Sequence, residues 1–212
     1  RSAADAIEAC FLALARKSSS QWIFEADIKS CFDKISHQWL QDNIPMDKDI
    51  LRKWLAAGYV DDGILHQTTE GTPQGGIASP TFLNLTLHGL EAAVINATSK
   101  HKDKVHLSIY ADDFIITGSS KEVLEQKVKP VVESFLLERG LELSKEKTKI
   151  THIDDGFDFL SFNVRKYKGK FITKPSKKSI KHFLSGIREI IKSNPTATTE
   201  NLIRLLNPKI RG

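Results

Sequence analysis

Two adjacent carboxylates, Asp112 and Asp113, stand between two stretches rich in apolar residues. Residues 105–109 alternate apolar and polar side chains, and residues 114–117 are β-rich, so the pattern predicts a hairpin with both carboxylates at its tip. At about 4 Å and an effective dielectric near 20, two such charges repel by roughly 4 kcal/mol. A solvated Asp-Asp turn would be the ordinary interpretation, whereas the apolar strands on both sides favour a divalent-cation site.

A third carboxylate, Asp27, ends another apolar run at residues 21–28. Two-metal phosphoryl transfer uses carboxylates from separated parts of a chain to hold two cations about 3.5–4 Å apart. Magnesium prefers oxygen ligands, waters and substrate phosphates. An antiparallel sheet could bring Asp27 beside Asp112. Asp33 is an alternative ligand, although its position is more typical of a turn or cap residue.

The elements that must position these side chains follow from hydrophobic periodicity and from helix start and stop signals. Helices are predicted at residues 2–17, 36–42, 47–57, 121–139, 176–193 and 199–206, with another long one starting near Ser79. Strands are predicted at 21–28, 64–69, 105–109, 114–117, 148–153, 157–165 and 170–173. This mixture of helices and strands indicates the α+β class. We expect an antiparallel sheet of about four strands, with helices packed on one face.

The charge of the chain is unevenly distributed. The net charge is +5 over 212 residues, yet the residues from Arg165 onward hold 13 basic and two acidic side chains, giving +11, and the preceding part carries −6. A basic segment beside an acidic body predicts a surface that binds a polyanion near a cation site.

Composition also bears on location. The sequence contains no run of 18 or more apolar residues, so no membrane-spanning helix is expected. Cys10 and Cys31 show no metal or disulfide spacing, which indicates a reducing compartment and a cytoplasmic location.

Five motifs in one order carry a resemblance to reverse transcriptases, especially those of group II introns. They are FEADIKSCF at 24–32, GTPQGG at 71–76 followed by Ser79-Pro80, YADD at 110–113, GLELSKEKTKI at 140–150 and FDFLSF at 157–162, with Ser161 where glycine is usual. The segments KPSKKSIKHFLSGIREII and LNPKIRG resemble the start of the maturase thumb. The resemblance covers essentially the whole chain and implies a reverse-transcriptase palm fold with a partial helical thumb.

The resemblance implies roles for the matching residues near the carboxylates. Asp27, Asp112 and Asp113 would be catalytic, and together with the carbonyl of Ile28 they would bind two Mg²⁺ ions, for which Mn²⁺ could substitute; Asp113 would have a supporting role. The incoming nucleotide would be contacted by Phe32, Gln74, Gly75 and Lys147. Phe32 would exclude a ribose 2′-hydroxyl, and Lys147 would donate a proton to pyrophosphate. From spacing alone, Phe32 could equally be a core residue and Lys147 a surface lysine.

Other matching residues would hold nucleic acid. The primer grip would consist of Phe159, Leu160, Ser161 and Phe162, although core packing also explains these side chains. Lys177, Lys178 and Lys181 would bind RNA. The expected partners are intron RNA, an RNA template, a DNA primer and deoxynucleoside triphosphates, and the sequence leaves the oligomeric state open.

The implied domains are a palm at residues 1–173, with the fingers largely missing, and the beginning of a thumb at 174–212. We therefore expect the 212 residues alone to extend primers poorly or not at all. The implied function is RNA-directed DNA synthesis for a group II intron, with assistance to splicing. A splicing RNA-binding protein with an idle polymerase site is an alternative, as is a reverse transcriptase of a retron or a diversity-generating element.

Overall fold

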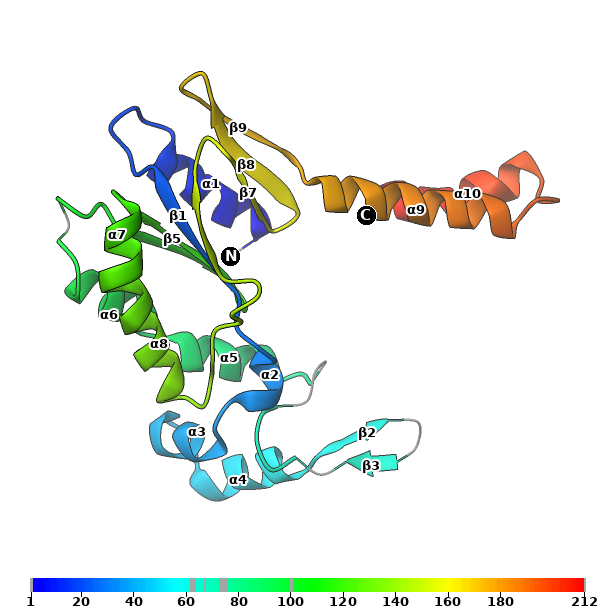
Figure 1. The fold of residues 1–212 in the computed structure, drawn as a ribbon. Coiled ribbons are helices and arrows are strands. Elements are labelled where there is room, and N and C mark those ends of the chain that lie inside the picture. The colour runs from blue at the N-terminus through cyan, green and yellow to red at the C-terminus, as the bar shows by residue number, and fades with distance from the viewer. Residues whose placement is uncertain (1, 62–63, 67, 73–75, 100, 212) are drawn as a thin grey trace.

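The core of the molecule is a four-stranded antiparallel sheet, seen in a computed structural model that describes residues 2–61, 64–66, 68–72, 76–99 and 101–211. Its strands are β1 (Trp22–Ala26), β4 (His106–Tyr110), β5 (Asp113–Gly118) and β6 (Lys149–His152), in the order β4-β5-β1-β6 (Figure 1). The register pairs Ala26 with Phe114 and Tyr110 with Asp113. The predicted α+β class and the antiparallel sheet are confirmed.

One face of this sheet is covered by helices, as predicted. These are α5 (Ser79–Leu87), α6 (Leu90–Asn96) and the continuous rod of α7 (Lys121–Val123), the π-helix η1 (Leu124–Val128) and α8 (Lys129–Leu137). Side chains alternate between the faces of a strand, so Phe24 and Phe114 both point into this layer, where each is at most 1% exposed. Full burial of such a side chain stabilises a fold by about 1.5–3 kcal/mol.

The opposite face is also covered, so the prediction of helices on a single face is incomplete. Helix α1 (Ala3–Leu14) packs there, and its N-cap is Ser2, whose side chain forms a capping box with Asp5. Beside α1 lies a second, three-stranded sheet of β7 (Phe157–Phe159), β8 (Phe162–Tyr167) and β9 (Lys170–Pro175). Ile23 and Ile115 point into this second core.

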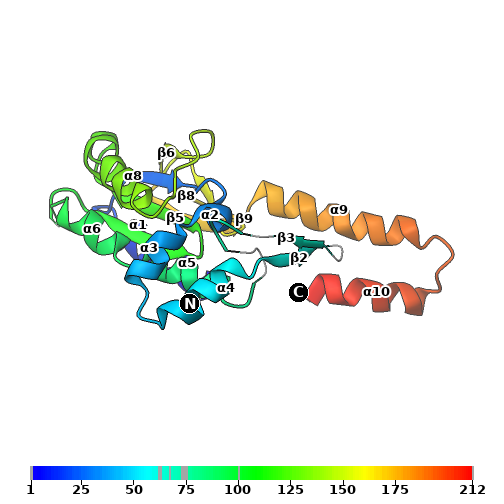
Figure 2. The ribbon, with the colours of Figure 1, turned by 90° about the horizontal axis from the view of Figure 1, so that it is seen from below.

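The remaining elements extend from this body. Below the sheet in Figure 1 lie α2 (Cys31–Lys34), α3 (His37–Asn43), α4 (Lys48–Ala56) and the hairpin of β2 (Tyr59–Asp61) and β3 (Ile64–His66). At the other end, α9 (Lys177–Ser193) and α10 (Thr199–Arg211) run side by side and antiparallel as an arm that projects from the body (Figure 2). Strand β9 ends at Pro175, two residues beyond the predicted domain boundary.

Four predicted elements differ from the structure in continuity, regularity or end point, and the sequence did not predict α2 or β2. The long helix starting near Ser79 is two helices, because Gly89 adopts a left-handed φ of +91° between α5 and α6. The predicted strand at 157–165 is divided into β7 and β8 by a turn at Leu160 and Ser161. The helix at 121–139 contains a π-helical segment just before Pro130, which lacks the N–H that a regular helix would use.

The fourth difference concerns the end of the chain. Helix α10 runs through Pro208 to Arg211 instead of ending at Asn207-Pro208. A proline removes one backbone hydrogen bond from a helix and need not end it. Within the described part of the chain, no helix is both long and apolar enough to cross a bilayer.

Candidate active site

The antiparallel register of the central sheet brings the three predicted carboxylates to one end. Ala26 lies opposite Phe114, so Asp27 follows β1 where β5 begins with Asp113. Tyr110 pairs with Asp113 across a two-residue turn, and Ala111 in that turn has a φ of +53°. Asp112 is therefore held at the hairpin tip, beside the end of β1, as the sequence predicted.

The pKa values of groups in and beside this cluster reflect its concentrated negative charge. The pKa of Asp113 is raised from 3.8, first by partial desolvation and then by the Asp112 and Asp27 carboxylates, whereas Lys147 lowers it. Burial, followed by the charges of Asp112, Asp27 and Asp33, raises the pKa of the Cys31 thiol to about 12. The carboxylates thus repel one another, and a cation would relieve this repulsion.

Lys147 supplies the closest positive charge. Its Nζ lies 3.3 Å from both carboxylate oxygens of Asp27, although 69% of the lysine side chain is exposed. Among the described residues, no three His, Cys, Asp or Glu side chains are arranged to hold a metal ion. The donors themselves suit Mg²⁺, which prefers carboxylate oxygens and carbonyls, so the residue types fit a divalent cation once Asp27 is released from Lys147.

Ile28 and Phe32 extend the site from β1 towards α2. Ile28 forms a β-bridge with Leu143, and the hydrogen bonds of this bridge use the flanking groups, Lys29 N–H to Glu142 O and Ser144 N–H to Asp27 O. These two hydrogen bonds do not use the Ile28 carbonyl oxygen, and its role as a metal ligand stays a prediction.

The structure places Phe32 against the core, and its predicted role in excluding a ribose 2′-hydroxyl stays a prediction. It packs against the main core, and it also lines a cavity of about 490 Å³. The other residues lining this cavity are Pro80, Leu83, Asn84, Ile109, Tyr110 and Ala111. Phe32 is thus a supported residue whose ring reaches open space beside the carboxylates.

Hydrogen bonds join the segment that leads to the predicted nucleotide-binding residues to α2 and to the start of α3. Gly71 N–H donates to Ile35 O at 2.8 Å, Thr72 N–H donates to Phe32 O at 2.6 Å, and the His37 ring lies 2.6 Å from Gly71 O. These contacts place the start of the loop next to Phe32. Gln74 and Gly75 lie outside the described residues, so their predicted contacts stay predictions.

The predicted primer grip is a tight turn. Phe159 and Phe162 pair across it, while Leu160 and Ser161 take φ values of +48° and +73°. Positive φ at both central residues characterises the hairpin turn that matches strand twist. Ser161 O accepts a hydrogen bond from Ser176 N–H at 2.8 Å, so the turn is joined to the start of α9.

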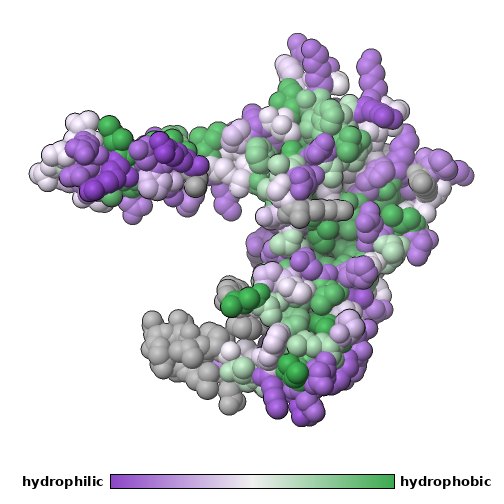
Figure 3. Space-filling view, turned by 180° about the vertical axis from the view of Figure 1, so that it is seen from behind, coloured by the Kyte–Doolittle hydropathy of each residue, from purple (hydrophilic) through white to green (hydrophobic). Residues whose placement is uncertain are grey.

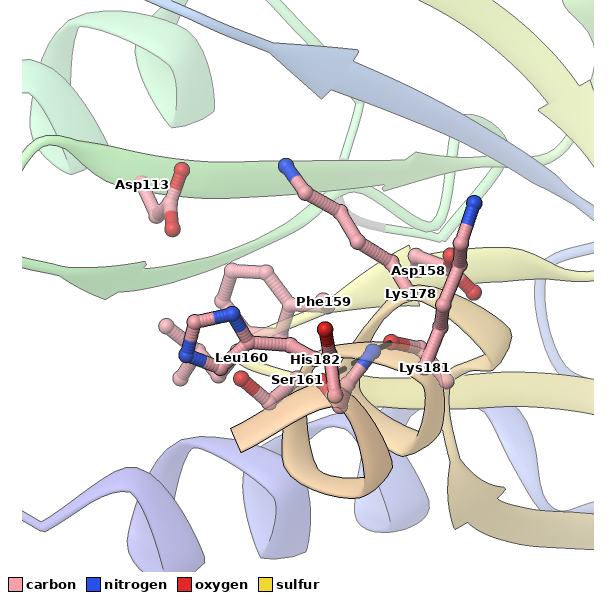
Figure 4. A pocket seen from close by; sticks show the side chains of 11 residues that line it. Asp113, Asp158, Phe159, Leu160, Ser161, Lys178, Lys181 and His182 are labelled. Carbon is pink, nitrogen blue, oxygen red and sulfur yellow. Dashed lines mark hydrogen bonds between the residues drawn. The ribbon is translucent and has the colours of Figure 1, made fainter. Parts of the chain in front are cut away.

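A pocket of about 790 Å³ lies between this turn and α9 (Figure 4). Asp113, Phe159, Leu160 and Ser161 line one side. Across the pocket, α9 contributes Lys178, Ser179, Lys181, His182 and Ser185. In Figure 4 the two lysines extend from α9 towards Asp158 and the strands. Phe162 and Lys177 are not among the described lining residues, so the structure does not bring them to this pocket.

Sequence reasoning did not name five of the lining residues as site residues: Asp158, Ser176, Ser179, His182 and Ser185. Asp158 alternates with the buried Phe157 and Phe159 in β7, and His182 and Ser185 lie four and seven positions after Lys178. Residues at these helical spacings share one face, so the spacing could have identified the α9 residues. The position of Asp158 depends on how β7 packs against the rest of the fold.

The fold and the carboxylate cluster define a polymerase palm. The family model described as "Reverse transcriptase (RNA-dependent DNA polymerase)" matches residues 1–164, and the chain belongs to this family. The predicted family and fold are thereby confirmed.

Two relatives indicate which reverse transcriptases the chain resembles. It is 30% identical to the group II intron-encoded protein LtrA of Lactococcus lactis subsp. cremoris, over 81% of this chain and 39% of LtrA. It is 26% identical to protein YkfC of Escherichia coli K12, over 73% of this chain and 50% of YkfC. The chain thus spans half or less of the length of these relatives. The predicted resemblance to group II intron proteins is confirmed.

Two solved structures share the fold at low identity. Apo telomerase from Candida tropicalis matches with a TM-score of 0.59 and 13% identity, over 88% of this chain and 39% of that chain. Telomerase from Candida albicans, solved with a fragment of telomeric RNA, matches with a TM-score of 0.55 and 14% identity, over 99% of this chain and 41% of that chain. Both similarities concern the fold alone.

Proposed function

We propose that the protein is an RNA-directed DNA polymerase of a group II intron, which also binds the intron RNA and assists its splicing. The observation that carries this proposal is the meeting of Asp27, Asp112 and Asp113 at one end of the central sheet. The similarity to LtrA supports the intron assignment. The partners would be intron RNA, an RNA template, a DNA primer and deoxynucleoside triphosphates.

Asp27, Asp112 and the Ile28 carbonyl would hold two Mg²⁺ ions, with Asp113 in support. When bound, such ions activate the attacking hydroxyl and stabilise the leaving oxygen. The protein itself contributes positioning and electrostatics, which account for most of the catalysis of phosphoryl transfer. The desolvation and repulsion that raise the pKa of Asp113 make this cluster a place where added positive charge is favourable.

The residues around the cluster would orient the nucleotide. Phe32 lines the neighbouring cavity and is held by the core behind it, so it would occupy the space that a 2′-hydroxyl needs. Lys147 would move from Asp27 to the leaving pyrophosphate and donate a proton there. Gln74 and Gly75, on the loop that follows Thr72, would contact the same nucleotide.

Nucleic acid would lie between the primer-grip turn and α9. Phe159, Leu160 and Ser161 shape one wall of the 790 Å³ pocket, and Lys178 and Lys181 bring positive charge to the other. Lysine ammonium groups contact phosphates without reading sequence, which fits a surface that must move along a growing duplex. Lys177 would bind RNA on another side of α9.

Single-nucleotide addition tests this proposal. A DNA primer annealed to an RNA template is incubated with excess protein, Mg²⁺ or Mn²⁺, and the matched deoxynucleotide. We expect one added nucleotide, lost in Asp112→Asn and retained in Asp155→Asn, which removes an exposed carboxylate elsewhere. Addition that persists in Asp112→Asn would contradict the assignment of this cluster as the polymerase site. Because these 212 residues alone are expected to extend primers poorly or not at all, a splicing protein with an idle site is favoured only if a protein that joins them to the family's fingers and complete thumb also adds no nucleotide.

A further inference from the structure

The hairpin of β8 and β9 has two chemically different faces. Val164 and Lys166 are at most 4% exposed, and Phe171 packs on the second core with its ring 5.4 Å from that of Phe11. This face is turned towards the body. Side chains alternate between the two faces of a strand, so the residues that alternate with these inward-facing ones point away from the body. This outer face consists of Asn163, Arg165, Tyr167, Lys170, Ile172 and Lys174.

The hairpin is held firmly enough to act as a platform. Lys166 Nζ donates to Arg16 O at 2.8 Å and to Ser19 Oγ at 3.0 Å, and burial lowers its pKa. At the tip, Lys168 and Gly169 take φ values of +51° and +74° in a two-residue turn. Positive φ at both positions matches the twist of the flanking strands. The outer face therefore needs little reordering to bind a ligand.

The charge on this hairpin has a single sign. Residues 162–175 include five basic side chains and no acidic one. Lys166 is buried, and the half-buried Arg165 donates to Asp154 O at 2.9 Å, so Lys168, Lys170 and Lys174 carry most of the exposed charge. Asp158, at the base of the face, receives a hydrogen bond from Asn163 at 2.7 Å. Seen from behind, hydrophilic residues project from the top of the molecule above a largely hydrophobic area (Figure 3).

An aromatic ring stands among these charges. Tyr167 is 53% exposed, and the Arg165 guanidinium carbon and Lys168 Nζ each lie 5.6 Å from its ring centroid. A cation over an exposed ring strengthens an interaction only about 2- to 5-fold. Stacking of a nucleobase on an aromatic side chain strengthens binding by about 5- to 150-fold. A base can therefore replace one cation on the ring, and the released cation is then free to contact a phosphate.

We propose that the outer face of the β8–β9 hairpin binds single-stranded nucleic acid, with a base stacked on Tyr167 and phosphates contacting Arg165, Lys168 and Lys170. Asp158 belongs both to the base of this face and to the pocket beside α9. A strand leaving that pocket can thus continue along the hairpin to its tip. This surface is distinct from the carboxylate cluster, and it binds whether or not the polymerase site is active.

Binding of a labelled 12-nucleotide oligouridine, measured against salt concentration, tests the proposal. Tyr167→Ala should weaken binding by about 5- to 150-fold, whereas Tyr167→Phe, which keeps the ring, should bind like the parent. Lys168→Gln with Lys170→Gln should reduce the slope of log affinity against log salt by about 1.4, since each phosphate contact on a single strand contributes about 0.7.

Matched controls separate this surface from others. Arg52→Gln with Lys53→Gln removes the same charge from α4 and should leave the slope unchanged. Repeating the Tyr167 comparison in a Lys178→Gln, Lys181→Gln background should give the same fold-change, because stacking on Tyr167 does not depend on phosphate contacts made by α9. Oligothymidine and a 12-base-pair RNA duplex show whether the strand is RNA or DNA and whether it must be single.

Two results would overturn the proposal. One is a Tyr167→Ala variant that keeps the parent's melting temperature and its affinity for oligouridine. The other is a salt slope that the tip lysines change no more than the α4 control does, which decides the matter even if Tyr167→Ala loses its fold. Duplex binding that weakens equally in Tyr167→Ala would also contradict base stacking by a single strand.

Discussion

Substituting Gly71 by alanine should detach the start of the predicted nucleotide-binding loop. A Cβ at this position would lie 2.4 Å from the carbonyl carbon of Asp33 and 2.5 Å from the Phe32 carbonyl oxygen. Both atoms belong to the backbone of α2, so side-chain rotation cannot relieve the overlap. The loop must move, and its hydrogen bonds to Phe32 and Ile35 are lost.

The size of the effect follows from these contacts. Gly71 has a φ of +74°, and left-handed backbone costs a residue with a Cβ about 1 kcal/mol. Two backbone hydrogen bonds contribute about 0.5–1.5 kcal/mol each, so Gly71→Ala should reduce the free energy of unfolding by about 2–4 kcal/mol. At about 2–4 °C per kcal/mol for a protein of this size, the melting temperature should fall by about 4–16 °C.

Gly169→Ala is the matched control. Gly169 also has a φ of +74°, but no heavy atom of the described residues lies within 4 Å of the point that a Cβ would occupy there. Gly169→Ala should therefore reduce the free energy of unfolding only by the cost of the left-handed backbone, about 1 kcal/mol. Thermal melts of both variants measure the difference, and titration with a deoxynucleotide should show weaker binding for Gly71→Ala alone. Equal melting temperatures for the two variants would refute the steric reasoning.

Three further variants test separate parts of the site. Because the folded-state pKa of Asp113 is raised above 3.8, the metal-free protein should lose stability as pH rises from below 3.8 through that pKa; melts against pH should lack this component in Asp113→Asn, and identical profiles would exclude it. Phe32→Ala should raise ribonucleotide incorporation relative to deoxyribonucleotide while divalent-ion binding persists, whereas loss of the fold would identify Phe32 as a core residue only. Neutralising Lys177, Lys178 and Lys181 together should reduce the slope of log affinity for RNA against log salt by about two to three units. Neutralising only Lys178 and Lys181 should produce most of this reduction, and an unchanged slope would place this face away from phosphate.

Local chemistry predicted much of the fold. The alternation before Tyr110 and the β-rich run after Asp113 specified the hairpin that carries the carboxylates. Helix caps at Ser2, Ser36 and Ser176 are all present, each with a side-chain oxygen that accepts a backbone N–H of the first turn. These features depend on neighbours within a few residues, so sequence patterns contain them.

Features decided by tertiary packing were not predictable. Apolar residues continue at helical spacing on both sides of Gly89, so the pattern shows little sign that the helix breaks there and that α6 turns to pack with α8. Leu160 and Ser161 adopt positive φ although neither is glycine. The pairing of Phe159 with Phe162 imposes this backbone conformation. Asp158 and His182 share a pocket only because β7 and α9 lie together in the fold.

Binding of Mn²⁺, followed by electron paramagnetic resonance in the presence of a deoxynucleoside triphosphate, tests the carboxylate site most directly. We expect the parent and Asp155→Asn to bind the ion alike, and Asp27→Asn and Asp112→Asn to bind it at least about ten-fold more weakly, equivalent to 1.4 kcal/mol. Unchanged affinity in both Asp27→Asn and Asp112→Asn would contradict the assignment of this cluster as the metal-binding centre of a polymerase.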